Sequence, residues 1–351
     1  MIALKVSLHD PTGIQSLSFF ANTLTKRQEV TMSNNKKRVL IGIDGSVQSF
    51  NAAAYISGIM PPDKTQVVLY HVDAEIMDLY FDVEDKPDMA SIEKASYKDW
   101  MAMRKKNMGE RIEKTRSLFI DRGFPGKDVE IITREIEIGV TRDIIEESRR
   151  NYDLLVVGKT GTRSVTGITT GSVTGKLISK VFHIPVVVVE GRPETTQLLA
   201  GFDGSTGSVS AIRNMVSLSV LDKQITICHV IRSMNLMAGD FDVFSTTLDP
   251  GYYPEFDIKR IEHQKKTINQ AMQSEKEWLV ARGIPAARIQ TCIMEGYMSR
   301  SQGLVEKARK EGFGSIVLGR RGHSAVLEFF IGRVGKKVIQ MSDSMAVWIM
   351  N

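Results

Sequence analysis

The sequence predicts an α/β protein made of two tandem five-stranded parallel-sheet sandwiches, each a Rossmann-like layer of strands covered by helices. Three observations predict this fold class: an internal repeat, strand-like runs that are apolar along their whole length, and helix-like segments between consecutive runs. Continuous apolar runs are typical of parallel strands that are buried on both faces. Parallel neighbours also require crossover connections, which the helix-like segments supply.

An internal repeat divides the chain into two similar units. Each landmark of the first unit returns 158 to 161 residues later, in the same order. The four pairs are VLIGIDGS at 39–46 and LLAGFDGS at 198–205, VVLYHVD at 67–73 and ITICHVI at 225–231, RGFP at 122–125 and RGIP at 282–285, and VVGKTG at 156–161 and VLGRRG at 317–322. Four landmarks in one order indicate a tandem duplication of a unit of about 155 residues.

The boundary between the two units is the polar segment 190–197. It contains one Gly and one Pro and is typical of a domain linker. The sequence therefore predicts one domain over 36–191 and a second over 197–351. Strands are expected near 38–43, 67–72, 129–135, 154–158 and 185–190, and near 198–202, 224–230, 289–294, 315–319 and 345–350. Helix-like sequence lies between them, as at 141–150, where Ile144 and Ile145 share one face.

Two long stretches, 74–115 and 232–278, separate the second and third strands of the two domains. The simpler interpretation of each is a loop that leads into a long helix. The alternative is a dedicated partner site, because binding loops are often built from such insertions.

Residues 1–35 precede the first repeat and are expected to form a poorly ordered N-terminal extension. Met32 is followed by the polar run 33–37, which is typical of a protein start, so residues 1–31 are interpreted as upstream sequence. The short apolar patch at 16–20 lacks the basic start and continuous apolar core of a secretory signal.

Composition argues against several classes of protein. The 351 residues carry 46 Lys and Arg against 41 Asp and Glu, a net charge of +5, and the charges are interleaved. This pattern argues against a nucleic-acid partner, and no apolar stretch approaches the length of a membrane span. Cys228 and Cys292 lie in apolar runs, so we expect buried thiols in a reducing compartment and a cytoplasmic protein.

Candidate ligand-binding residues follow the strands, because open parallel sheets bind ligands beyond the carboxyl ends of their strands. Asp44 ends the first strand, and Val72 lies at the end of the second. After the fourth strand comes a glycine-rich segment over 158–172, in which Gly158 and Gly161 are followed by nine residues and then Gly171-Ser172. Glycine allows backbone to approach a ligand closely, and a helix begins after Gly171, where free N–H groups favour an anion.

Polar side chains in this segment suit a phosphate. The hydroxyls of Ser172 and Thr174 could donate hydrogen bonds to phosphate oxygens, and Lys159 could add positive charge. Neither the P-loop pattern nor the GxGxxG pattern of dinucleotide-binding domains is present.

The spacing G-x2-G-x9-G-[ST], together with a strand-ending Asp and a second strand that ends in HV, resembles the universal stress protein family in its tandem two-domain form. The resemblance covers residues 36–351 and implies domains of the adenine-nucleotide α-hydrolase type. It implies an ATP site in the first domain, with the adenosine end at Asp44 and Val72. The remaining residues implied are Val157, Gly158 and Gly161 along the ribose-phosphate path and Gly171, Ser172 and Val173 at the phosphates.

The second domain departs from this pattern at one position. Asp203, Val230, Gly319, Gly322 and Gly332 keep their places, but Arg333 replaces the Ser or Thr of the motif. One interpretation is that Arg333 fills the phosphate pocket and ATP binding is lost or altered, and we favour it. The other is that Arg333, with Arg320 and Arg321, binds an anion.

Simpler structural roles compete with binding at several of these positions. Asp44 and Asp203 could each cap the helix that follows. His71 and His229 lie inside apolar strands and are expected to be core histidines with backbone partners. The sequence offers no nucleophile with a base, no paired carboxylates and no common metal motif, so no catalytic or metal-ligating residue is predicted.

The leading hypothesis is a stress-response protein that binds ATP, with or without magnesium, in its first domain and acts as a nucleotide-dependent regulator or interaction protein. The alternatives are a nucleotide-independent scaffold with relic pockets and a slow ATP-hydrolysing or transferase enzyme. From the resemblance we expect the two domains to pair as a pseudo-dimer. An unknown protein partner and a homodimer through the edges of the fifth strands are further expectations.

Overall fold

The computed structural model describes residues 36–73, 94–159, 172–193, 196–218, 222–232, 254–322 and 331–351. The chain divides into a unit at Met1–Lys36 and a second unit at Lys37–Asn351, and only the second is described below. The predicted N-terminal extension at 1–35 lies outside the described residues, as do the starts of the two long stretches, 74–93 and 233–253.

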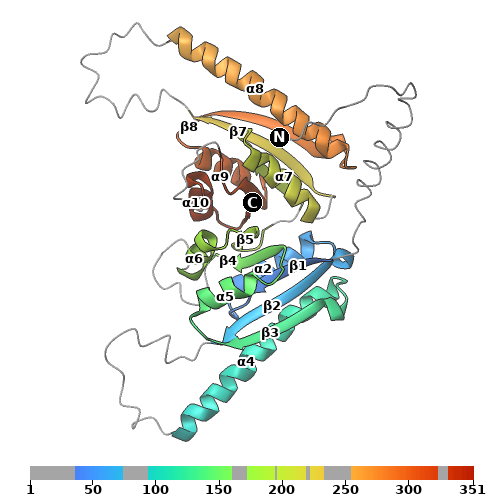
Figure 1. Ribbon diagram of the computed structural model, residues 1–351, viewed down its shortest axis with the longest axis vertical. Coiled ribbons are helices and arrows are strands. Elements are labelled where there is room, and N and C mark those ends of the chain that lie inside the picture. Colours follow the sequence, from blue (N-terminus) through green and yellow to red (C-terminus); the bar gives the residue numbers. More distant parts are fainter. Residues whose placement is uncertain are drawn as a thin grey trace, which may run out of the picture. The chain divides into compact units, whose positions relative to one another are not determined.

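Strands and helices alternate along the chain, as the repeat predicts (Figure 1). The first half contains β1 (Lys37–Gly42), α2 (Val47–Ile59), β2 (Thr65–Asp73), α4 (Lys94–Asp121), β3 (Val129–Glu135), α5 (Val140–Ser148), β4 (Leu154–Gly158), α6 (Ser172–Lys180) and β5 (Val186–Val189). The second half contains β6 (Gln197–Gly201), α7 (Thr206–Leu218), β7 (Gln224–Arg232), α8 (Pro254–Val280), β8 (Ile289–Tyr297), α9 (Arg300–Glu311), β9 (Ser315–Gly319), α10 (Arg333–Met341) and β10 (Ala346–Met350). Short 3₁₀ turns precede β2, β3 and β8 at Pro62–Lys64, Gly126–Asp128 and Ala286–Arg288.

The ten strands form one sheet in the order β3-β2-β1-β4-β5-β10-β9-β6-β7-β8. Within each half the neighbours run parallel, and the order 3-2-1-4-5 recurs in the second half. The predicted α/β class with two tandem five-stranded parallel sheets is confirmed.

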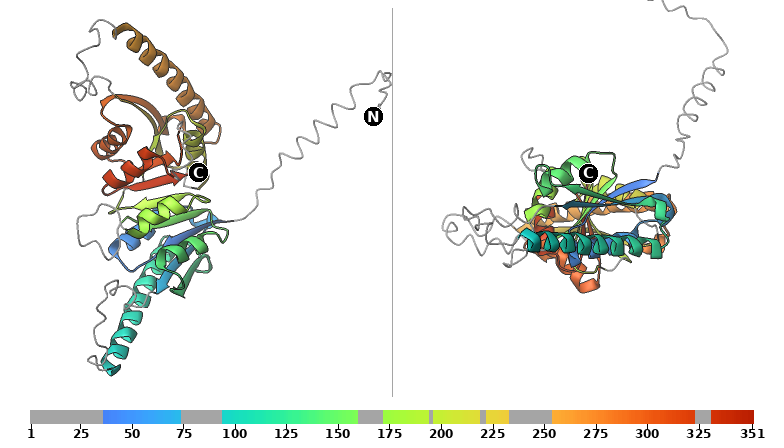
Figure 2. Two further views of the ribbon diagram at one scale, coloured as in Figure 1. Left: turned by 60° about the vertical axis from the view of Figure 1, so that its left-hand side comes forward. Right: turned by 90° about the horizontal axis from the view of Figure 1, so that it is seen from below.

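Two apolar layers cover the faces of the sheet. One layer packs the sheet against α2, α4, α7 and α8, and the other packs it against α5, α6, α9 and α10. Helices lie on both sides of the strands in Figure 2. Strands such as β5, which is buried at all four residues, have apolar neighbours on both faces, which explains their unbroken apolar sequence.

The two halves are joined by the only antiparallel strand pair within the described residues. β5 pairs with β10, and Val187 lies opposite Trp348. Each fifth strand therefore occupies the edge of the other, so the expected homodimer through these edges is wrong.

A buried polar cluster crosses this seam between the halves. The indole Nε1 of Trp348 donates to the hydroxyl of Tyr55 on α2, at 2.7 Å. The same hydroxyl lies 2.6 Å from Ser315 Oγ, where β9 begins. Burial raises the pKa of the Tyr55 phenol, so it stays neutral and can both accept and donate.

Candidate functional site

The turn between β1 and α2 places Asp44 at the carboxyl end of the sheet. Gly45 has φ of 72°, which glycine adopts without strain. Ser46 is the N-cap of α2, because its hydroxyl accepts from the Ser49 N–H at 3.1 Å. Asp44 is therefore not the helix cap. Its Oδ1 accepts from the Ser46 N–H at 3.0 Å, and no partner for Oδ2 is found among the described residues.

The same turn recurs at the start of the second half, with a more fully engaged carboxylate. Asp203 Oδ1 accepts from both the N–H and the hydroxyl of Ser205, at 3.0 and 2.5 Å. Ser205 in turn accepts from the Ser208 N–H and lies at the start of α7. Gly322 also lies against this carboxylate, because a Cβ added to it would be 2.5 Å from Asp203 Oδ2.

Val72 and Val230 present backbone rather than side chain at the ends of the second strands. Both side chains are buried in the layer beneath α5 and α9. The carbonyl of Tyr70 accepts from Ile43 N–H at 2.8 Å on the β1 side. Because successive residues of a strand alternate in direction, the N–H and C=O of Val72 point to that same side, beyond the end of β1.

The two strand histidines have structural roles, as the sequence analysis expects. His71 Nδ1 donates to the carbonyl of Ile43 at 2.8 Å, and His229 Nδ1 donates to that of Phe202 at 2.7 Å. Both carbonyls lie just before the strand-ending aspartates. Each histidine therefore holds the end of the first strand against the second and helps to fix the position of the aspartate.

The first motif glycine of each half, Gly158 at the end of β4 and Gly319 at the end of β9, lies so close to a neighbouring helix that a side chain would not fit. A Cβ added to Gly158 would lie 3.0 Å from the backbone carbon of Gln48 on α2. A Cβ added to Gly319 would lie 2.5 Å from the carbonyl oxygen of Gly207 on α7. Sequence reasoning assigned these glycines to ligand approach alone and missed this second role.

Gly319→Ala should therefore destabilise the protein by about 1–3 kcal/mol in urea denaturation, because the new methyl group meets backbone that cannot rotate away. Gly109→Ala in α4 is the matched control, since a Cβ there meets nothing within 4 Å. We expect this control to raise stability by about 0.5–1 kcal/mol through helix propensity. Equal midpoints for the two variants would contradict the packing role.

The phosphate side of the predicted site is only partly described. Gly161 and Gly171 lie outside the described residues, and Ser172 is the first residue of α6. The partly buried Val173 packs against the layer beneath α5. Thr174 is not available to a phosphate as predicted, because its hydroxyl donates to the Gly158 carbonyl at 2.7 Å and is buried there.

Lys159 also has a structural role in place of the predicted phosphate contact. Its ammonium is buried and lies 2.6 Å from Glu190 Oε2. It donates as well to two carbonyls at the C-terminal end of α10, those of Gln340 at 3.3 Å and of Ser342. The lysine therefore joins the first half to the second and neutralises the negative end of a helix.

Arg320 makes the reciprocal connection from the second half. Its guanidinium donates to the carbonyl of Ile178 on α6 at 3.1 Å and to Asn351 Oδ1 at 2.7 Å. Burial, with the nearby charge of Arg321, lowers the pKa of Arg320 to about 10. Arg320 is thus held in the seam between the halves, which disfavours the alternative in which it binds an anion together with Arg321 and Arg333.

Arg333 is the first residue of α10, directly after the N-cap Gly332. Its side chain is exposed, and no partner for it is found in the part of the chain that the structure covers. The Gly332 N–H donates to the Arg320 carbonyl at 2.9 Å, which ties the start of α10 to the end of β9.

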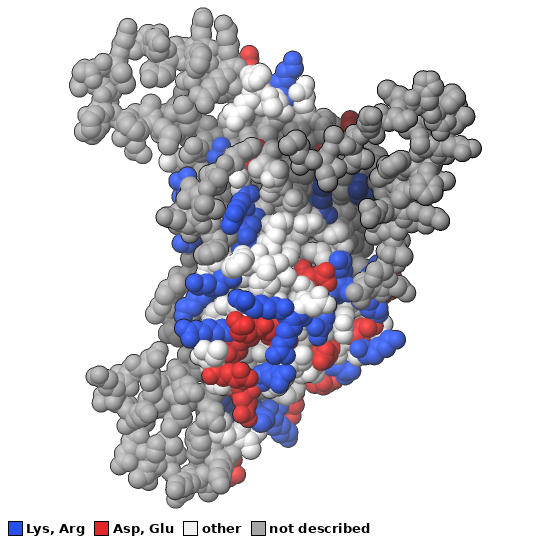
Figure 3. All heavy atoms as spheres, in the orientation of Figure 1, with Lys and Arg blue, Asp and Glu red and all other residues white. Residues whose placement is uncertain are grey.

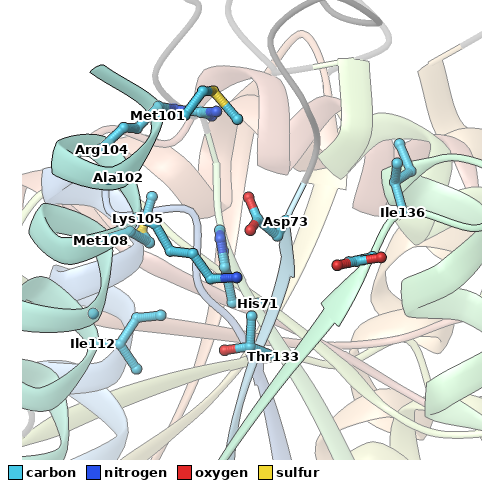
Figure 4. Close-up of a pocket in the computed structure, with 12 residues that line it drawn as sticks. His71, Asp73, Met101, Ala102, Arg104, Lys105, Met108, Ile112, Thr133 and Ile136 are labelled. Carbon is cyan, nitrogen blue, oxygen red and sulfur yellow. The ribbon is translucent and has the colours of Figure 1, made fainter. Parts of the chain in front are cut away.

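A pocket of about 570 Å³ lies between α4 and the carboxyl ends of β2 and β3 (Figure 4). Figure 4 shows Lys105 extending from α4 toward the strands, with His71, Asp73 and Thr133 facing the same space. The pocket adjoins the Asp44 turn, because Met108 lines it and packs against Gly45. Sequence reasoning assigned no site residue to α4, whose residues carry no motif.

Charge on the surface is mixed. On the face shown in Figure 3, Lys and Arg side chains are interspersed with Asp and Glu over the first half. No group of three or more His, Cys, Asp or Glu that could hold a metal ion occurs among the described residues. None of the helices in the described ranges is long and apolar enough to cross a membrane.

The model of the Universal stress protein family matches the chain twice, at residues 36–190 and 194–349. The chain belongs to the universal stress protein family. The two matches follow each other in tandem and coincide with the two copies of the internal repeat. Both copies of this universal stress protein contain a parallel sheet and a strand-ending aspartate.

Two solved structures share the fold of this universal stress protein. A universal stress protein from Archaeoglobus fulgidus is 17% identical with a TM-score of 0.56, and the match covers 91% of this chain and 99% of that one. A protein of unknown function from Pseudomonas aeruginosa is 12% identical with a TM-score of 0.50, covering 90% and 92%. No curated protein sequence matches the chain significantly.

Proposed function

We propose that this universal stress protein is a cytoplasmic regulator of the stress response that binds ATP in its first domain. Membership of the family supports the stress-response role. The observation that carries nucleotide binding is the carboxylate of Asp44. It stands at the carboxyl end of the sheet, one of its oxygens has no partner among the described residues, and it adjoins the pocket beneath α4.

The adenosine end of the nucleotide would lie at β1 and β2. Asp44 Oδ2 would accept a hydrogen bond from a ribose hydroxyl or the adenine amine. The N–H and C=O of Val72, which point beyond the end of β1, would pair with the polar edge of the base.

The phosphates would lie toward α6. Val157, Gly158 and Gly161 would line the path from ribose to phosphate. Gly171, Ser172 and Val173 would offer backbone N–H groups where α6 begins, and the helix dipole favours negative charge there. Magnesium would accompany the triphosphate by neutralising part of its charge.

The second domain is proposed to have lost or altered this binding. Its equivalent residues are Asp203, Val230, Gly319, Gly322, Gly332 and Arg333. Asp203 already accepts two hydrogen bonds from Ser205 and has Gly322 against its other oxygen, so less of this carboxylate is open to a ligand than at Asp44. The exposed Arg333 replaces the small hydroxyl residue of the motif.

The paired aspartates provide a matched test by titration calorimetry with ATP and magnesium. Asp44→Ala should weaken binding by about 1–3 kcal/mol, or roughly five- to 150-fold, because a polar contact of the nucleotide is lost. Asp203→Ala changes the same turn in the second domain and should leave the affinity within about twofold. Unchanged affinity in Asp44→Ala, or equal losses in both variants, would refute the proposed site.

A nucleotide-independent scaffold is the second candidate function. It is favoured by Lys159 and Thr174, because both side chains, which could have contacted a phosphate, make structural contacts instead. Mass spectrometry of small molecules released on denaturation separates the two functions. About one adenine nucleotide per chain supports the ATP site, whereas none, with no binding of added ATP and magnesium, supports the scaffold.

A further inference from the structure

The two cysteines of the chain lie side by side on neighbouring strands. Cys228 on β7 is the register partner of Cys292 on β8, and both are free thiols. Both side chains belong to the apolar layer beneath α9. Neighbouring strands are about 4.8 Å apart, and Cα atoms joined by a disulfide are usually separated by roughly 4.4–6.8 Å. The pair can therefore be joined without a change of strand register.

The two thiols differ in exposure and in chemistry. Cys228 is 1% exposed, whereas Cys292 is partly exposed on β8, the last strand of the sheet. The pKa of the Cys292 thiol is lowered, chiefly by the neighbouring Cys228 thiol, although burial acts in the opposite direction. The pKa of Cys228 is raised by the same neighbour and by burial. The ammonium of Lys307 on α9 also lowers the pKa of Cys292, and Glu311, which lies 2.7 Å from that ammonium, acts in the opposite direction.

We propose that Cys228 and Cys292 form a peroxide-responsive pair that closes a reversible disulfide within the second domain. Cys292 is the attacking thiol, because it is the more exposed member and has Lys307 nearby. Cys228 is the resolving thiol, because it is buried and lies directly opposite Cys292 in the strand register. This inference is independent of the nucleotide site.

The oxidant is hydrogen peroxide. The Cys292 thiolate attacks one peroxide oxygen, so that an S–O bond forms, the O–O bond breaks and hydroxide leaves. The Cys228 sulfur then attacks Cys292, the S–S bond forms, and hydroxide leaves from sulfur. With the two thiol protons, the products are one disulfide and two waters. A dithiol reductant reverses the net change by thiol–disulfide exchange.

The sequence allows the bond to be located directly. Trypsin cleaves after Lys223, Arg232, Arg288 and Arg300, which places Cys228 in peptide 224–232 and Cys292 in peptide 289–300. The full chain is treated with about one equivalent of hydrogen peroxide, blocked with iodoacetamide, and digested without reductant. We expect the two peptides to be joined within one chain, with loss of both titratable thiols and full recovery after dithiothreitol.

Substitutions at Cys228 and Lys307 test the role of the resolving thiol and of the nearby positive charge. Cys228→Ala keeps a small apolar group in the core and should leave Cys292 as a sulfenic acid that dimedone traps. Lys307→Gln should slow thiol loss by about three- to tenfold, because the thiolate loses its cationic neighbour. Lys310→Gln is the matched control on the exposed side of α9 and should leave the rate unchanged.

Several outcomes would overturn the proposal. Two free thiols after peroxide treatment would show that the pair is inert. Disulfides only between chains, seen as a dimer on a non-reducing gel, would show that the two thiols do not react with each other. Equal rates for Lys307→Gln and Lys310→Gln would remove the role of Lys307, and sulfinic acid at Cys292 without a cross-link would remove that of Cys228.

Discussion

Trp348→Ala is expected to lower the free energy of unfolding by about 3–5 kcal/mol. The indole is fully buried on β10, and its ring lies edge-on to Tyr55 at 6.3 Å between centroids. Truncation leaves a cavity and also removes the hydrogen bond to the Tyr55 hydroxyl. Urea denaturation followed by circular dichroism measures the change.

A double-mutant cycle separates the cavity from the hydrogen bond. Trp348→Phe and Tyr55→Phe should each cost about 1–3 kcal/mol, since each leaves a buried polar atom of the cluster without this partner. The double variant should cost less than the sum of the two, because both members of the pair are then apolar. A loss below about 1 kcal/mol in Trp348→Ala would show that the seam does not depend on this cluster.

Lys159→Met should destabilise the protein by about 3–5 kcal/mol. Methionine has a similar volume, but it removes the buried partner of Glu190 and leaves the carbonyls of Gln340 and Ser342 without their donor. The loss falls on contacts between the two halves. Urea denaturation followed by two spectroscopic signals should therefore show two separate unfolding transitions in the variant, whereas in the wild-type protein the transitions of the two halves should lie closer together.

Lys37→Met provides the control for the loss of a lysine ion pair. Lys37 also bonds a carboxylate, Asp153 at 3.0 Å, but the two side chains are 43% and 34% exposed. Exposed pairs of this kind contribute about 0–1 kcal/mol, so the midpoint should hardly move. Similar losses in the two lysine variants would contradict the special role of Lys159.

The repeat and the apolar runs were sufficient to predict the strands and the parallel pairing within each half, but not the order of the strands in the sheet. Strand β4 at Leu154–Gly158 coincides with the prediction, and β1 at Lys37–Gly42 differs by one residue. These features are encoded locally, in residues that must be apolar because they are covered on both faces. The two strand histidines also have the backbone partners that their apolar surroundings predict.

The roles of Lys159 and Arg320 could not be predicted in the same way. Each contacts carbonyls more than a hundred residues away, across a seam that exists only after β5 and β10 have paired. One signal was present: the two basic residues follow the first motif glycine at matched positions of the repeat. A shared structural role would explain that match as well as a phosphate contact does.

The Tyr55–Trp348 cluster left no signal in the repeat at all. The residues at the matching positions are Asn214 and Val187, which differ from them in chemistry. Asn214 instead donates to the carbonyl of Asn351 at 3.1 Å. The repeat could therefore predict the common architecture but not the contacts in which the two copies differ.

The pairing of β5 with β10 within one polypeptide has a consequence for how this seam behaves in a cell. Two separate chains would associate only above their dissociation constant, whereas tethered partners meet at an effective concentration of about millimolar whatever the expression level. Dilution therefore does not separate the two halves. In a symmetric homodimer the two contacting surfaces are identical, but two domains of one chain can differ in sequence. Tyr55 and Asn214, which occupy matching positions of the repeat, could therefore acquire different contacts.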